Sequence, residues 1–153
     1  MKIGFLGLGV MGLPMAINVV KKSGCQVLGF DIEPARLKAF QAEGGLAVEA
    51  AVEIYKKCDV IMQILPTHPI IINSVEQAMK YGKPGNVIVD LSSTAPDIIQ
   101  DLYGKVKEAG MFLLDSPVSG GNPAAIGGTL AIMTGGDKEV FKKIKPYLVC
   151  MGK

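Results

Sequence analysis

The chain has 153 residues, a length that suits a single domain with one sizeable core. Hydrophobic residues make up 49% of it and charged residues 20%, a composition that excludes intrinsic disorder. The formal net charge of +2, the absence of tryptophan and an aromatic share of 6% argue against binding of nucleic acid through a basic or stacking surface. We therefore expect a compact domain without a nucleic-acid partner.

Two features of the sequence bear on where the protein resides. Residues 3–20 carry no charge, as in a signal peptide or a short membrane span, but four glycines and Pro14 interrupt them and no small-residue cleavage site follows. Cys25, Cys58 and Cys150 show neither a CxxC motif nor metal-ligand spacing, which favours buried free thiols in a reducing compartment. We expect a cytoplasmic protein without a membrane segment or a metal site.

Short apolar runs alternate with helical patterns along the chain. The runs predict strands at residues 2–6, 26–30, 45–47, 59–64, 87–90, 111–114 and 130–134. The helical patterns predict helices at residues 11–23, 33–42, 49–57, 69–80, 96–109, 122–126 and 138–144, the last ended by Pro146. Strands that alternate with helices form parallel sheets, and continuously apolar strands are buried on both faces. The sequence therefore predicts an α/β domain with a doubly wound, mostly parallel sheet.

A glycine-rich turn lies between the first predicted strand and the first predicted helix, and it fits the pattern G-x-G-x-x-G. The first glycine permits a tight turn, the second lets backbone approach a pyrophosphate, and the third lets helix and strand pack closely. The helix N-terminus offers free N–H groups to the phosphates. The turn predicts a Rossmann dinucleotide-binding fold with cofactor contacts from Gly7, Leu8, Gly9, Val10, Met11 and Gly12. A tight turn without a ligand is the alternative.

Asp31 ends the second predicted strand, at the place where a carboxylate accepts hydrogen bonds from the adenosine ribose. Its charge would repel a 2′-phosphate, and Glu33 adds to that repulsion. Arg36 is the only nearby cation and falls inside the next predicted helix. These charges favour NAD over NADP as the cofactor. As an alternative, Asp31 caps the helix that begins near Glu33.

Three later loops follow predicted strands, and in a doubly wound sheet such loops border the ligand crevice. Leu65 and Pro66 follow residues 59–64, next to His68, for which a surface or capping use is favoured. Hydroxyls in residues 90–96 can contact the nicotinamide end, while one of them caps the following helix. Residues 119–121 open a short helix whose N–H groups and hydroxyl suit a carboxylate. A plain turn or cap is the alternative in each loop.

Taken together, the motifs resemble the cofactor-binding half of the β-hydroxyacid dehydrogenases, the family of 3-hydroxyisobutyrate dehydrogenase and tartronate semialdehyde reductase. The domain is similar to the NAD-binding domain of 6-phosphogluconate dehydrogenase. The resemblance rests on residues 5–18, 65–67, 90–96 and 116–130, which occur in family order. It implies that residues 7–12 hold the pyrophosphate and that Asp31 binds the adenosine ribose. Leu65 and Pro66 would line the cofactor, and Ser93 would lie near the nicotinamide ribose. The substrate carboxylate would be bound by Ser119, Gly120 and Gly121.

The resemblance also implies hydride transfer between a nicotinamide cofactor and a small 3-hydroxy acid, with a lysine as general acid/base in a G-x-x-x-K-x-x-x-N context. No lysine of this chain has that context, so no catalytic residue is assigned here. We expect residues 1–153 to form one dinucleotide-binding domain, with the lysine and an all-helical domain after Lys153. Alone it should bind NAD weakly, be inactive, and associate as a homo-oligomer or through apolar surface. The alternative is a free-standing dinucleotide-binding or interaction module without catalytic activity.

Overall fold

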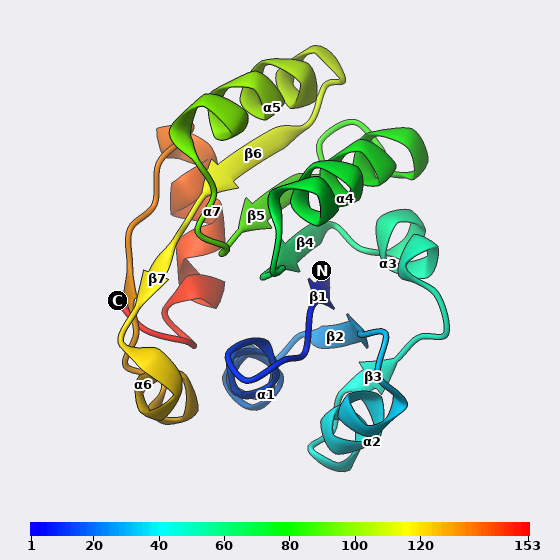
Figure 1. Ribbon diagram of the computed structural model, residues 1–153, viewed down its shortest axis with the longest axis vertical. Coiled ribbons are helices and arrows are strands. Elements are labelled where there is room, and N and C mark those ends of the chain that lie inside the picture. The colour runs from blue at the N-terminus through cyan, green and yellow to red at the C-terminus, as the bar shows by residue number, and fades with distance from the viewer.

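The computed structural model describes all 153 residues, which form a central sheet with helices on both sides (Figure 1). In chain order the elements are β1 (Lys2–Leu6), α1 (Gly12–Lys22), β2 (Gln26–Phe30), α2 (Pro34–Ala42), β3 (Leu46–Ala47), α3 (Ala51–Lys57), β4 (Val60–Gln63), α4 (His68–Tyr81), β5 (Val87–Asp90), α5 (Pro96–Glu108), β6 (Phe112–Asp115), β7 (Val118–Ser119), α6 (Gly121–Gly127), β8 (Ala131–Ile132) and α7 (Lys138–Leu148). No helix combines the length and apolar composition needed to cross a membrane.

The main sheet has six parallel strands in the order β3-β2-β1-β4-β5-β6. The chain winds outward from β1 to β3 and then returns to β4 on the other side of β1. The loops after β1 and β4 therefore diverge, and a crevice opens at the carboxyl ends of these neighbouring strands, as at every such switch point. The predicted doubly wound Rossmann fold is confirmed.

Successive strand residues point to opposite faces, which explains why the strands are continuously apolar. Val87 and Val89 belong to a cluster of 21 buried residues beneath α1, α6 and α7, whereas Ile88 belongs to a cluster of 14 beneath α3, α4 and α5. Each layer of helices thus covers its own core. Neither layer of helices covers the carboxyl edge of the sheet, and the loops that follow the strands lie there.

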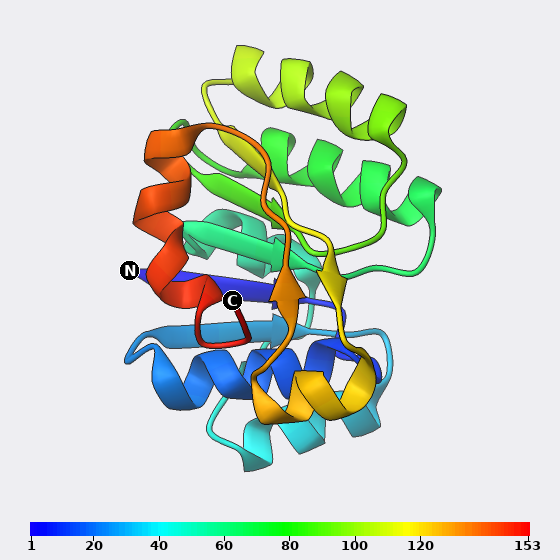
Figure 2. The ribbon, with the colours of Figure 1, turned by 90° about the vertical axis from the view of Figure 1, so that its left-hand side faces the viewer.

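The segment after β6 departs from the predicted pattern. Residues 130–134 do not add a parallel strand; only Ala131–Ile132 is extended, and it pairs antiparallel with β7 in a separate two-stranded sheet. Figure 2 shows these two strands, yellow and orange, lying side by side. Residues 120–130 hold the short α6 and a left-handed turn at Gly128, which reverse the chain and bring it back beside β7. The chain therefore returns antiparallel.

The last helix also differs from the prediction, because α7 continues through Pro146 to Leu148. Val140, Ile144 and Leu148 recur every four residues and are all buried. Burial of a leucine side chain contributes about 1.5–3 kcal/mol, which is comparable to the roughly 3 kcal/mol that a proline costs inside a helix. Pro146 is exposed near the helix end, so packing of the apolar face prevails over the local signal.

Candidate functional site

The glycine-rich turn between β1 and α1 is shaped by steric constraints. Gly7 has a φ of +91°, and a Cβ atom there would overlap the carbonyl oxygen of Ile64. A Cβ on Gly12 would overlap the carbonyl oxygen of Gly7, so the helix packs directly on the turn. A Cβ on Gly9 would meet only the Arg36 guanidinium, at 3.5 Å. The first and third glycines are therefore needed for packing, and the second leaves open backbone.

Four successive backbone N–H groups in this turn, those of residues 9–12, donate no hydrogen bond within the protein. After these four residues, Leu13 is the next one whose N–H is bonded, to the carbonyl of Gly9. The N-cap of α1 is Met11, which provides no capping side chain. Free N–H groups at the positive end of a helix dipole form a site that favours an anion. The turn can therefore hold a phosphate group.

Asp31 lies beside this turn, just after β2, and is 8% exposed. Its Oδ2 accepts the N–H of Leu8 at 2.8 Å, and its Oδ1 accepts the N–H of Glu33 at 2.9 Å. A carboxylate has about four acceptor positions, so two remain for a ligand. The N-cap of α2 is Glu33, so the alternative role of Asp31 as a helix cap does not hold.

Arg36 lies inside α2, as predicted, but its side chain extends back toward the glycine-rich turn. Its Nη1 lies 3.7 Å from Asp31 Oδ2, and its Nε lies 3.3 Å from Glu33 Oε2. Two carboxylates therefore face one guanidinium at this corner of the site. The local charge is net negative once all three side chains are counted.

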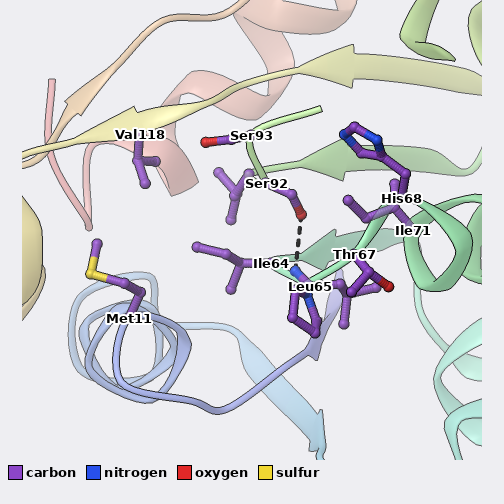
Figure 3. Close-up of a pocket in the computed structure, with 11 residues that line it drawn as sticks. Met11, Ile64, Leu65, Thr67, His68, Ile71, Ser92, Ser93 and Val118 are labelled. Atoms are coloured by element: carbon purple, nitrogen blue, oxygen red, sulfur yellow. Dashed lines mark hydrogen bonds between the residues drawn. The ribbon is translucent and has the colours of Figure 1, made fainter. Parts of the chain in front are cut away.

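Two cavities adjoin along the carboxyl edge of the sheet. The first, of about 520 Å³, is the one that contains Asp31, and it is lined by Leu6, Gly7, Gly9, Met11, Gly12, Phe30, Asp31, Ile32, Arg36, Ala51, Tyr55, Ile64, Leu65, Pro66, Ile70, Asn73 and Ser74. The second, of about 450 Å³, is shown in Figure 3 and is lined by Met11, Ile64, Leu65, Pro66, Thr67, His68, Ile71, Leu91, Ser92, Ser93 and Val118. Both use Met11, Ile64, Leu65 and Pro66, so these four residues form a shared wall.

The second cavity lies between the loops after β4 and β5, and side chains join these loops. Ser92 Oγ accepts the N–H of Leu65 at 2.9 Å (Figure 3). The buried carboxylate of Asp90 accepts the N–H of Ser92 at 3.2 Å and the hydroxyl of Thr94 at 2.5 Å. Asp90 and Ser92 thus position both loops. The sequence prediction missed the role of Ser92, because its bond to Leu65 joins segments that are 27 residues apart.

A second link between the same loops involves His68, the first residue of α4. Its Nε2 accepts the N–H of Ala95 at 3.4 Å, and Ala95 is the N-cap of α5. The histidine thus contacts the backbone at the start of α5, in line with the surface or capping use that the sequence favoured. The predicted capping of this helix by a hydroxyl is wrong, because the Thr94 hydroxyl is drawn to Asp90 instead.

A row of polar side chains lies across the carboxyl ends of three neighbouring strands. Gln63, Asp90 and Asp115 occupy paired positions at the ends of β4, β5 and β6. Burial raises the pKa of the Asp115 carboxyl, and the nearby charge of Asp90 raises it further by a smaller amount. Gln63 Nε2 donates to Asp90 Oδ1 at 3.4 Å, whereas Gln63 Oε1 and Asp115 Oδ1 have no partner. These two unpaired oxygens therefore lower the stability of the fold at this edge of the sheet.

The structure brings most of the predicted cofactor residues to the two cavities, with two exceptions. Leu8 is buried and contributes its N–H to Asp31, and Val10 is 70% exposed outside both cavities. Ser93 is exposed at the second cavity. The predicted substrate residues Ser119, Gly120 and Gly121 line neither cavity; they are exposed, next to the lining residue Val118.

Residues 2–153 match a family of known sequences, described as the NAD binding domain of 6-phosphogluconate dehydrogenase. The chain belongs to this family. Membership agrees with the anion site and the switch-point crevice, and it shows that the chain is an NAD-binding domain. The resemblance inferred from the motifs is confirmed.

Relatives of this NAD-binding domain are hydroxyacid dehydrogenases. It is 41% identical to 2-(hydroxymethyl)glutarate dehydrogenase of Eubacterium barkeri, over 99% of this chain and 51% of the relative. It is 36% identical to human mitochondrial 3-hydroxyisobutyrate dehydrogenase, over 98% of this chain and 45% of the relative. The structure of Mycobacterium tuberculosis 3-hydroxyisobutyrate dehydrogenase with L-serine has a TM-score of 0.94 and 33% identity, over 99% of this chain and 52% of that one. The NAD-binding domain thus spans about half the length of these relatives.

Proposed function

We propose that this domain binds NAD along the carboxyl edge of its sheet and serves hydride transfer between the cofactor and a small 3-hydroxy acid. One observation carries the proposal: two adjoining cavities share a wall, and free backbone N–H groups lie in the turn that borders them. A dinucleotide has two nucleosides joined by a pyrophosphate, so it matches a site made of two cavities and an anion site. The dehydrogenase relatives support the reaction class.

Each part of the cofactor has residues that suit it. The free N–H groups of residues 9–12 would hold the pyrophosphate. The unused acceptor positions of Asp31 would take the adenosine ribose hydroxyls, and the exposed Ser93 hydroxyl the nicotinamide ribose. Leu65 and Pro66 would form an apolar wall that excludes water. Bound NAD would supply the hydride acceptor.

NAD is the proposed cofactor in preference to NADP. A 2′-phosphate on the adenosine ribose would lie next to Asp31 and close to Glu33, whose negative charges repel it. Arg36 is the cation at hand, but its guanidinium already faces both carboxylates. We therefore expect NADH to bind at least tenfold more tightly than NADPH.

The substrate carboxylate is assigned to Ser119, Gly120 and Gly121, on the strength of the family resemblance and their position beside Val118. No lysine lines either cavity. We place the general acid/base lysine and the helical second domain outside residues 1–153, in keeping with the half-length match to the relatives. Loss of general acid/base help lowers rates by about 10²–10⁴, so the domain alone should show little or no turnover.

Isothermal titration calorimetry of NADH and NADPH on the purified domain tests this proposal. The wild-type chain should bind NADH, and Asp31→Asn should lower NADH affinity about tenfold and bring it closer to that of NADPH, because bonds to a charged acceptor are lost. Glu108→Gln removes an exposed carboxylate on α5 and should change neither affinity. A folded domain that releases no heat with NADH, or that prefers NADPH, would contradict the proposal.

Two further parts of the proposal concern the protein's surroundings. Its three cysteines are free, which supports a reducing, cytoplasmic compartment.

Val10, Ile126 and Met133 are each more than half exposed, which supports association of the isolated domain through apolar surface. A monodisperse monomer in analytical ultracentrifugation would contradict the association. A whole gene product that binds NADH but oxidises no hydroxy acid would favour a module without catalytic activity.

A further inference from the structure

Asn122, the second residue of α6, joins two loops that are far apart in the sequence. Its Nδ2 donates a hydrogen bond of 2.7 Å to the carbonyl oxygen of Val10, 112 positions earlier. Val10 lies in the glycine-rich turn, and Asn122 directly follows the residues assigned to the substrate carboxylate. One side chain therefore connects the proposed phosphate site with the proposed substrate loop.

The geometry of the peptide bond gives this contact a consequence for Met11. The peptide between Val10 and Met11 is planar and trans, so its carbonyl and its N–H point in opposite directions. Holding the Val10 carbonyl therefore fixes the direction of the Met11 N–H, one of the four free N–H groups of the turn. A hydrogen bond accepted by the carbonyl also polarises the peptide and makes its N–H a better donor.

The helix that carries Asn122 is itself fixed to α1. Asn18 of α1 donates from Nδ2 to the carbonyls of Ala125 and Ile126 at 2.8 and 3.2 Å, near the end of α6. Figure 2 shows α6 in yellow and orange alongside α1 in blue. With Asn122 at one end and Asn18 at the other, α6 is held at both ends against the element that presents the free N–H groups.

We propose that Asn122 is a positioning residue that aims the Met11 N–H at the cofactor pyrophosphate and links cofactor binding to residues 119–121. The inference rests on the proposed binding of NAD. When the pyrophosphate engages Met11, the Val10 carbonyl becomes a stronger acceptor, and the bond to Asn122 tightens. Because linkage is reciprocal, order imposed on the loop by a substrate carboxylate strengthens cofactor binding in turn.

The first test measures the affinity of NADH and of ADP-ribose by calorimetry. Asn122→Ala should weaken both ligands by the same factor, about three- to tenfold, because both contain the pyrophosphate and a single hydrogen bond is lost. Asn122→Gln, whose amide can still reach the carbonyl, should recover most of the affinity. Gln100→Ala removes an exposed amide on α5 and should have no effect. Thermal melting verifies that each variant is folded.

The second test uses amide hydrogen exchange with and without NADH. In the wild-type chain, binding should slow exchange in residues 7–12 and also in residues 119–123. In Asn122→Ala, at saturating NADH, only the first segment should be protected. A merely structural role for Asn122 would not separate the two segments.

The outcomes distinguish the inference from the proposed function. If Asn122→Ala binds both ligands as tightly as wild type, or if residues 119–123 are still protected, the inference is overturned and the NAD proposal stands. A loss confined to NADH also overturns it, because the effect would then follow the nicotinamide and not the pyrophosphate. A wild-type chain that binds neither ligand overturns both.

Discussion

The two halves of the proposed cofactor site are built differently. The adenosine half is built mainly at the ends of β1 and β2, residues 6–12 and 30–36, and residues 51–74 complete its wall. It is held by close backbone contacts at glycines and by two main-chain N–H groups that donate to the Asp31 carboxylate. The nicotinamide half is assembled from loops after β4 and β5 together with Val118, and is held by side-chain bonds through Ser92, Asp90 and His68. The first half depends on glycines that lack side chains and on one carboxylate, whereas the second depends on several polar side chains from different loops.

The largest expected effect is that of Gly7→Ala in the adenosine half. The new Cβ would meet the Ile64 backbone in a left-handed conformation, so we expect a loss of about 3 kcal/mol or more in the free energy of unfolding, measured by urea denaturation. Gly24→Ala is the matched control: its φ is +70° but no atom lies within 4 Å, so strain alone should cost about 1–2 kcal/mol. Equal losses in the two variants would mean that close packing does not shape the turn.

A smaller and more local effect is expected for Ser92→Ala in the nicotinamide half. It leaves the Leu65 N–H without its partner, at a cost of about 1–3 kcal/mol, and loosens one wall of the second cavity. Affinity for NADH should fall more than affinity for ADP-ribose, which lacks the nicotinamide, because Ser92 lines only the second cavity. The neighbour Ser93→Ala should weaken NADH without lowering stability, since this hydroxyl is exposed and makes no internal hydrogen bond. An equal loss for both ligands in Ser92→Ala would show that the two halves are not independent.

The smallest effect concerns the pH dependence of stability that Asp115, at the end of β6, causes. Because its pKa is raised in the folded protein, the folded state binds more protons than the unfolded chain between the ordinary and the raised value. This group therefore lowers stability as pH rises through that window, and the loss is complete above the raised pKa. Asp115→Asn should be more stable than wild type at pH 7, and the difference should vanish below the ordinary carboxyl range.

Urea denaturation at several pH values measures this difference. The side chain of Asp115 accepts no hydrogen bond, and its backbone bonds with Gly135 stay in place, so the variant loses little else. Glu108→Gln, an exposed carboxylate on α5, should show no such trend. A variant that is less stable than wild type at pH 7 would mean that the polar row stabilises the fold.

Most of the fold could be predicted as far as β6, because the strands and helices there carry their own apolar patterns and are separated by glycine or proline signals. The prediction failed where burial competed with a local signal. Pro146 indicated the end of a helix, but the buried side chains at 140, 144 and 148 extend it. The apolar run at residues 130–134 predicted a strand of the main sheet, but α6 and the turn at Gly128 reverse the chain, and residues 131–132 pair antiparallel with β7.

The glycine turn, Asp31 and the family of this domain were all determined by the sequence alone, because the glycine spacing, the strand before it and the acid after it are local and chemically specific. Only the tertiary structure decided which side chains hold the site in place. The bonds of Ser92 to Leu65, His68 to Ala95 and Asn122 to Val10 join segments that the sheet brings together after they have been separated along the chain. A serine, a histidine or an asparagine in a loop has many partners to choose from, and only packing selects one.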